Sequence, residues 1–224
     1  MRLAILASLN GTNARAIVEA AGSGALDAEV AVIVTNRPEA GVVSLFKDSD
    51  IPVEIIPSKG IKDREEYDRM VVDVLKGYGV DTIALAGWMR ILSGLFLDAF
   101  PGRIVNLHPA LLPSFPGGTG IADAYAFGVK IAGCSVHLVN PVLDGGPIII
   151  QAAVPVGGTA AELEERIHRM EHLIFPQALQ WMAEGRISVE GHRTSLAPSS
   201  RSVREVSVVE GCLISPALEQ SFPA

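Results

Sequence analysis

The chain has 224 residues, of which 49% are hydrophobic, and its formal net charge at pH 7 is −7. This length suits one domain of ordinary to large size with a sizeable core, and the hydrophobic content excludes a disordered protein. The acidic balance argues against a general nucleic-acid surface, because phosphate-binding domains are normally basic.

The sequence indicates a cytoplasmic protein without a membrane anchor. No apolar run approaches the roughly 18 residues that a membrane span needs, and the run at 3–8 is too short for a signal-peptide core. Cys134 and Cys212 form neither a zinc pattern nor a C-x-x-C motif. We therefore expect no metal site and no disulfide framework, which fits a reducing compartment.

Short apolar runs recur along the chain and alternate, in its first half, with stretches of helical character. The apolar runs occupy residues 3–8, 30–36, 53–57, 82–87, 104–109, 134–139 and 147–155. The helical stretches occupy residues 13–22, about 39–49 and 63–78. This β-α-β-α alternation predicts an α/β fold with a doubly wound, mostly parallel sheet, to which the late strands are parallel or antiparallel additions.

A long amphipathic helix is expected near the end of this domain. Thr159 and Glu162 have the spacing of a capping box, and apolar residues follow at steps of four, three and four. Pro176 should kink or interrupt the helix. Beyond about residue 196 the chain is rich in Ser and Pro, with a weak strand expected at 203–211. We expect a single domain over 1–196 and a peripheral tail over 197–224.

The first strand-to-helix turn contains Gly11, Thr12 and Asn13. Such a turn presents helix N-terminal amides at the carboxyl edge of the sheet, where phosphates bind, although Asn and Thr also suit a plain capped turn. No dinucleotide-binding or P-loop glycine motif is present, and Asn36, not an acidic residue, ends the second strand. A nicotinamide cofactor is therefore not expected.

A second group of polar residues suits the transfer of an acyl group to an amine. Asn106 and His108 project to the same face of one strand, and Asp144 lies in the sequence VLDGGP. Taken singly, they are strand-end polar residues and an Asp-Gly turn. Together, Asn106 would stabilise an oxyanion, His108 would move protons and Asp144 would orient or charge the imidazole. Cys134 lies on the strand face opposite His137 and is expected in the core.

Five segments of the chain resemble the phosphoribosylglycinamide formyltransferase family of the formyltransferase superfamily. They are NGTN (10–13), LAGWMRILS (85–93), NLHPALLPSFPG (106–117), SVHLVNPVLDGGPIIIQ (135–151) and MEHLIFPQAL (170–179). The resemblance extends from Met1 to about Ile187, in the family's order and spacing. It implies a Rossmann-type formyltransferase fold and the transfer of a formyl group from 10-formyltetrahydrofolate to the amino group of glycinamide ribonucleotide in purine synthesis.

The resemblance also implies functions for particular residues. The catalytic positions are Asn106, His108 and Asp144, and the ribonucleotide positions are Gly11, Thr12, Asn13 and Glu171. The formyl-folate positions are Arg64, Met89, Arg90, Ile91, Leu92 and Asn106. Alternatively, Arg64 pairs within its own helix and the 89–92 segment only packs. The implied partners are small molecules without metal, nucleic acid or membrane, and the implied assembly is a monomer or homodimer.

The sequence departs from the family pattern on the ribonucleotide side. Leu9, Thr12 and Thr119 stand where the family usually has Gly, Ser and His, and Met170 replaces a more polar or basic residue. A β-carbon at position 9 disfavours a positive φ, which predicts a raised KM for the ribonucleotide. The alternatives are a formyl-folate hydrolase, a formyltransferase for another amine and a non-catalytic folate or nucleotide binding module.

Overall fold

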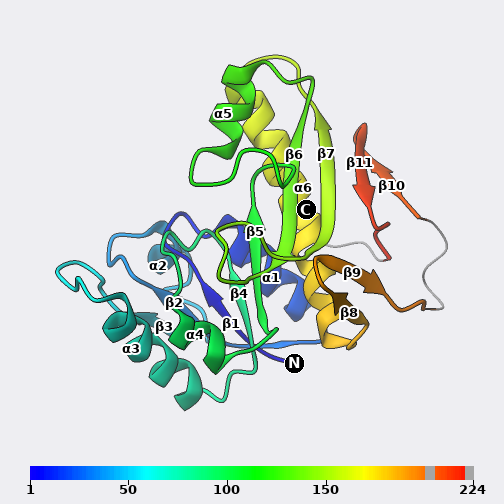
Figure 1. Cartoon of the computed structure of the whole chain (residues 1–224). Coiled ribbons are helices and arrows are strands. Elements are labelled where there is room, and N and C mark those ends of the chain that lie inside the picture. The colour runs from blue at the N-terminus through cyan, green and yellow to red at the C-terminus, as the bar shows by residue number, and fades with distance from the viewer. Residues whose placement is uncertain (200–204, 220–224) are drawn as a thin grey trace.

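The computed structural model describes residues 1–199 and 205–219, which form a nine-stranded sheet, a two-stranded sheet and flanking helices (Figure 1). The strands are β1 (Arg2–Leu6), β2 (Glu29–Thr35), β3 (Val53–Ile55), β4 (Thr82–Leu85), β5 (Ile104–His108), β6 (Ile131–Leu138), β7 (Ile148–Pro155), β8 (Ile187–Glu190), β9 (Arg193–Leu196), β10 (Ser207–Val209) and β11 (Cys212–Ser215). The helices are α1 (Thr12–Gly22), α2 (Gly41–Leu45), α3 (Arg64–Gly77), α4 (Gly94–Ala99), α5 (Gly120–Phe127) and α6 (Ala160–Ala183).

The large sheet has the strand order β10-β11-β7-β6-β5-β4-β1-β2-β3. The strands from β3 to β5 in this order are parallel. β6 is antiparallel to β5, and β7 and β11 continue the antiparallel pairing. The predicted doubly wound α/β fold is therefore confirmed, and its late strands are antiparallel.

Two helical layers cover the two faces of the sheet (Figure 1). Along β1, Leu3 and Ile5 face the layer of α1 and α6, whereas Ala4 and Leu6 face the layer of α3 and α4. All four side chains are fully buried. Successive side chains of one apolar strand therefore pack in two different cores, on opposite faces of the sheet. Because both faces are buried, the central strands are hydrophobic throughout.

The predicted helices are present, although α2 is much shorter than expected. α1 and α3 lie within one residue of the expected bounds, and α3 begins where the Asp63 carboxylate accepts the backbone N–H groups of Glu65 and Glu66. The prediction of a helix over 39–49 is wrong beyond residue 45 because the chain there leaves the helix for β3. α4 and α5 were not predicted, since each has eight or fewer residues.

α6 begins with the expected capping box, in which Thr159 and Glu162 bond to each other's backbone. The expected interruption at Pro176 is wrong, since the helix is continuous from Ala160 to Ala183. Phe175, Pro176 and Ala178 are all buried. Core packing therefore offsets the hydrogen bond that proline removes from the helix.

The tail contributes two strands to the edge of the sheet. Residues 203–204 of the expected strand lie outside the described residues, and β10 occupies 207–209 within the rest of it. β11 was not predicted, and it pairs with β7 between Leu213 and Ala153. Its side chains at Cys212 and Ile214 are buried in the core that contains α6.

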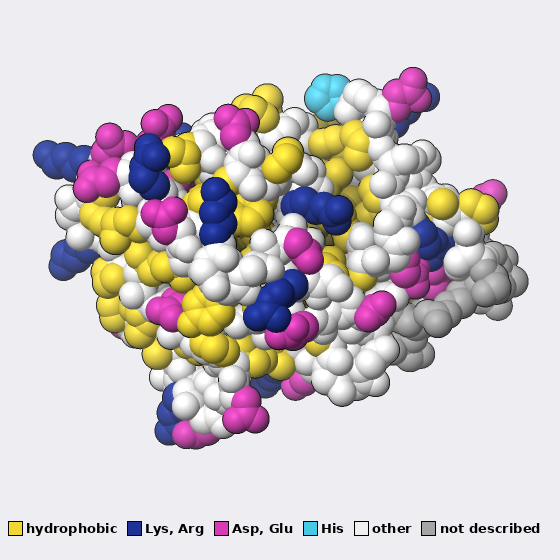
Figure 2. Space-filling view, turned by 90° about the horizontal axis from the view of Figure 1, so that it is seen from below, with side chains coloured by type: hydrophobic (Ala, Val, Ile, Leu, Met, Phe, Trp, Pro, Cys, Tyr) yellow, Lys and Arg dark blue, Asp and Glu magenta, His cyan; other side chains and the backbone are white. Residues whose placement is uncertain are grey.

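The surface seen from below in Figure 2 mixes charges of both signs among hydrophobic and neutral groups. Acidic and basic side chains are interspersed across this face (Figure 2). Within the described part of the chain, no helix has both the length and the apolarity needed to cross a membrane.

Candidate active site

His108 is the last residue of β5 and lies between two hydrogen-bond acceptors. Its Nε2 is 2.8 Å from the carbonyl oxygen of Phe115, and its Nδ1 is 3.5 Å from Oδ2 of Asp144. Both side chains are largely buried. Because a carbonyl oxygen only accepts, Nε2 carries a proton, and a second proton on Nδ1 would face the carboxylate. This arrangement places a buried imidazole directly beside a carboxylate, as a candidate general acid or base requires.

Asn106 lies on the same strand, directly opposite His137 of β6. Nδ2 of Asn106 is 3.1 Å from Nε2 of His137, and Nδ1 of His137 is 2.9 Å from the carbonyl oxygen of Leu138. That carbonyl requires a proton on Nδ1, and burial lowers the pKa of His137, so Nε2 accepts from the amide. His137 therefore fixes which way the Asn106 amide points, and the amide retains a second N–H for another acceptor.

Asp144 is carried by an irregular turn between β6 and β7. Its φ is 50°, a left-handed conformation that aspartate adopts more readily than most residues. Oδ2 accepts the Gly117 backbone N–H at 2.8 Å, and Oδ1 lies 3.9 Å from Nε2 of His137. At Gly146 a β-carbon would lie 1.7 Å from the Leu138 carbonyl oxygen. Glycine there lets the turn close on the sheet and bring the carboxylate to both histidines.

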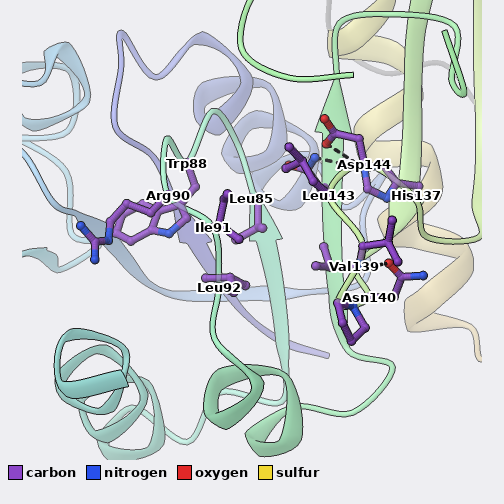
Figure 3. Close-up of a pocket in the computed structure, with 13 residues that line it drawn as sticks. Leu85, Trp88, Arg90, Ile91, Leu92, His137, Val139, Asn140, Leu143 and Asp144 are labelled. Carbon is purple, nitrogen blue, oxygen red and sulfur yellow. Dashed lines mark hydrogen bonds and ion pairs between the residues drawn. The ribbon is translucent and has the colours of Figure 1, made fainter. Parts of the chain in front are cut away.

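A pocket of about 100 Å³ opens beside Asn106, His137 and Asp144 (Figure 3). Trp88 and residues 90–92, which follow β4, form one part of its lining, and residues 139–144 form another. Figure 3 shows the labelled Trp88 and Arg90 across the pocket from His137 and Asp144. Most of the lining residues are apolar, and polar side chains lie on both sides of the pocket, a combination that is typical of a small-molecule site.

Four residues expected to bind formyl-folate line this pocket, namely Arg90, Ile91, Leu92 and Asn106. Met89 belongs to the same segment, and its side chain is 45% exposed. Arg64 is exposed at the start of α3 and does not line the pocket. Among the described residues Arg64 makes no ion pair, so the alternative of pairing within its own helix is not observed.

The expected phosphate loop lies at the N-terminus of α1. Gly11 has a φ of 82°, and a β-carbon there would lie 2.8 Å from Cγ2 of Val42. Glycine is therefore required at this position. Thr12 and Asn13 follow as the first helical residues, whose backbone N–H groups have no partner within the helix. The loop thus has amide donors that an anion could use, and phosphate binding there stays a prediction.

Glu171 reaches this loop from α6. Its Oε2 accepts Nδ2 of Asn13 at 2.9 Å and Nδ1 of His168 at 2.9 Å. Glu171 is 2% exposed, and its hydrogen bond raises the pKa of His168, while burial lowers the pKa of His172. The fold therefore brings together Asn13 and Glu171, two residues expected at the ribonucleotide, and adds a titratable imidazole beside them.

The departures from the family pattern do not all face this loop. Leu9 lies outside the positive-φ region, as expected, and is 46% exposed. Thr119 precedes α5 and donates its hydroxyl to Asp123. The interpretation of Met170 as a ribonucleotide-side change is wrong, because its side chain is 1% exposed and packs in the core.

Sequence reasoning missed His137, which is hydrogen-bonded to Asn106, and His168, which is hydrogen-bonded to Glu171. His137 was placed correctly on the face opposite Cys134, which is fully buried with the α6 core. Its partner Asn106 depends on the β5–β6 register, which the sequence pattern did not specify. His168 lies three residues before Glu171, so helical spacing was the available signal.

Known proteins resemble this chain over most of its length. The formyl transferase family matches residues 1–179. The chain is 35% identical over 191 residues to phosphoribosylglycinamide formyltransferase from Escherichia coli, which covers 84% of this chain and 90% of that protein. The crystal structure of glycinamide ribonucleotide transformylase 1 from Symbiobacterium toebii superimposes with a TM-score of 0.86 and 40% identity, covering 88% and 94% of the two chains.

A longer relative matches over the same region. Human trifunctional purine biosynthetic protein adenosine-3 is 38% identical over 190 residues, and this chain spans only 19% of its length. The family match runs from before Gly11 to beyond Glu171, so it includes both polar clusters and the pocket. The chain belongs to the formyl transferase family.

Proposed function

We propose that this protein transfers the formyl group of 10-formyltetrahydrofolate to the amino group of glycinamide ribonucleotide, a step of purine synthesis. The observation that carries the proposal is His108, held between a carbonyl oxygen and the Asp144 carboxylate beside a pocket that Asn106 lines. Two bacterial relatives are named phosphoribosylglycinamide formyltransferase, which supports glycinamide ribonucleotide as the acceptor.

In this proposal the amine of the ribonucleotide attacks the formyl carbon directly. The carbonyl oxygen becomes negatively charged, and the second N–H of the Asn106 amide donates to it. Nitrogen N10 of the folate leaves as the C–N bond breaks, while the amine loses one proton and N10 gains one. His108 carries protons between these nitrogens through Nε2, once a substrate group replaces the Phe115 carbonyl oxygen at that atom, and Asp144 on the Nδ1 side stabilises the imidazolium form.

The pocket beside Asn106 and the loop before α1 suit the two substrates. The pocket beside Asn106 suits the folate, because apolar side chains from 88–92 and 139–143 would pack on a flat ring system. The N-terminal amides of α1 suit the ribonucleotide phosphate. Glu171, oriented by Asn13 and His168, suits ribose hydroxyl groups as an acceptor.

The direct test is an assay of purified protein with 10-formyltetrahydrofolate and glycinamide ribonucleotide. Tetrahydrofolate and formylated ribonucleotide are measured together, and we expect them to form in equal amounts. Formate without formylated product would indicate a hydrolase. Binding of both molecules without any product would indicate a binding module.

A further inference from the structure

A buried polar network connects the carboxyl ends of β1, β2 and β4. Ser8 is 1% exposed and Asn36 is 6% exposed. The Ser8 hydroxyl donates to Oδ1 of Asn36 at 2.6 Å and accepts the backbone N–H of Met89 at 3.0 Å. Nδ2 of Asn36 then donates to the hydroxyl of Ser58 at 3.2 Å. The proposed chemistry uses none of these side chains.

The hydrogen-bond directions in this network are fixed by the groups themselves. The Met89 N–H can only donate, so it engages the Ser8 oxygen as an acceptor. The single proton of that hydroxyl is then directed to Asn36, whose amide nitrogen has its own acceptor in Ser58. Removing Asn36 would leave the hydroxyl without its buried acceptor, and removing Ser8 would leave the Met89 amide without its acceptor.

The segment that this network holds is part of the pocket lining. Met89 stands between Trp88 and Arg90, which both line the pocket, in a stretch without regular secondary structure. The Ser8 hydroxyl holds the start of this stretch, and the Asp68 carboxylate holds its end by accepting the Ser93 N–H at 2.6 Å. Arg90 also lies over the Tyr67 ring, 4.1 Å from its centroid.

We propose that Ser8, oriented by Asn36, is a positioning residue for the formyl-folate site. Its hydroxyl positions residues 88–92 relative to the end of β1, and this position determines the affinity of the pocket for the folate. The assignment of the ligand rests on the proposed function. The ribonucleotide loop has its own backbone attachments, from the Ala7 N–H to Val34 and from the Val42 N–H to Leu9, which a change of the Ser8 side chain leaves in place.

Ser8→Ala should therefore raise the KM for 10-formyltetrahydrofolate by roughly tenfold, because the Met89 amide loses its acceptor and the segment shifts. The KM for glycinamide ribonucleotide should stay within about twofold of wild type, since its loop keeps its backbone attachments. Asn36→Ala should change the folate KM in the same direction by a smaller factor. Ser23→Ala, which removes an exposed hydroxyl at the end of α1, is the control.

The experiment combines steady-state kinetics with amide hydrogen exchange of the ligand-free protein, at a temperature where every variant is folded. Faster exchange at residues 87–93 in Ser8→Ala, together with the selective rise in folate KM, would support the proposal. If wild type binds the folate without turnover, the proposed function fails, and the dissociation constant for 10-formyltetrahydrofolate replaces KM in the same comparison. Unchanged folate affinity, or an equal rise in both KM values, would overturn the positioning assignment.

Discussion

Three imidazoles near the proposed site differ in the groups that face them. His137 donates to a carbonyl oxygen and accepts from an amide, and burial lowers its pKa, so it is a neutral support for Asn106. His168 bonds a carboxylate, which raises its pKa. His108 faces a carbonyl oxygen on one side and a carboxylate on the other. Of the three, His108 has the surroundings of a group that moves protons.

Replacement of His108 by Ala should lower kcat by roughly 10² to 10⁴-fold, the range of a positioned acid or base. Both KM values should change far less, because the proposed substrate contacts come from other residues. Steady-state kinetics with each substrate varied in turn would measure the effect. His192→Ala, at the exposed turn between β8 and β9, serves as the control. A rate near that of wild type would remove His108 from the mechanism.

His168 should make the stability of the fold depend on pH. Its folded pKa is raised, chiefly by the hydrogen bond to Glu171 and further by the charges of Glu171 and Glu164. A raised folded pKa stabilises the protein fully below the unfolded value of about 6.5, and this contribution disappears as the pH rises through the folded pKa. The Tm difference between wild type and His168→Ala should therefore be larger at pH 6 than at pH 9.

Thermal unfolding between pH 6 and 9 would test this contribution. The His192→Ala variant is again a suitable comparison, because among the described residues no ion pair involves His192. A Tm difference for His168→Ala that stays constant across this range would show that the imidazole acts by packing, not by charge.

At the scale of elements, apolar runs predicted the strands well, whereas residue pairs across strands could not be predicted. β1 to β7 all lie within or next to expected runs, because a strand buried on both faces has a distinctive composition. The pairing of Asn106 with His137, and of Ser8 with Asn36, depends on register and strand order. The predicted interruption at Pro176 was wrong because it considered only the low helix propensity of proline and not the core in which the residue is buried.

The turn before α1 gives the element-scale prediction. Leu9 lies two residues before Gly11, and its φ is not positive. We expect the loop to present fewer amides than it would with a glycine at position 9. Leu9→Gly should lower the KM for glycinamide ribonucleotide and leave the KM for 10-formyltetrahydrofolate unchanged. Leu9→Ala shortens the side chain but keeps the β-carbon, so it should leave both values unchanged. An unchanged or higher ribonucleotide KM in Leu9→Gly would show that the loop is adapted to leucine.

At the scale of the molecule, the described part of the tail extends the large sheet beyond β7. β11 pairs with β7, which would otherwise be an edge strand of the large sheet. The Arg186 guanidinium bonds the Glu219 carboxylate, and the two side chains are 10% and 6% exposed. The Glu219 N–H also donates to Oε1 of Gln177 on α6 at 2.8 Å. The tail is therefore attached both to the sheet and to the helix that carries Glu171.

Deletion of residues 205–224 should lower Tm by roughly 5 °C or more, because the core loses the buried side chains of Cys212 and Ile214, and Arg186 loses a buried partner. It should also promote association, since β7 would present unpaired backbone groups along its edge. Differential scanning calorimetry and light scattering would measure the two effects. Leu213→Ser is the control, because that side chain is 46% exposed and the strand pairing is kept. If the shortened chain has the Tm of the intact protein and does not associate, the prediction is wrong, and the sheet is stable without β10 and β11.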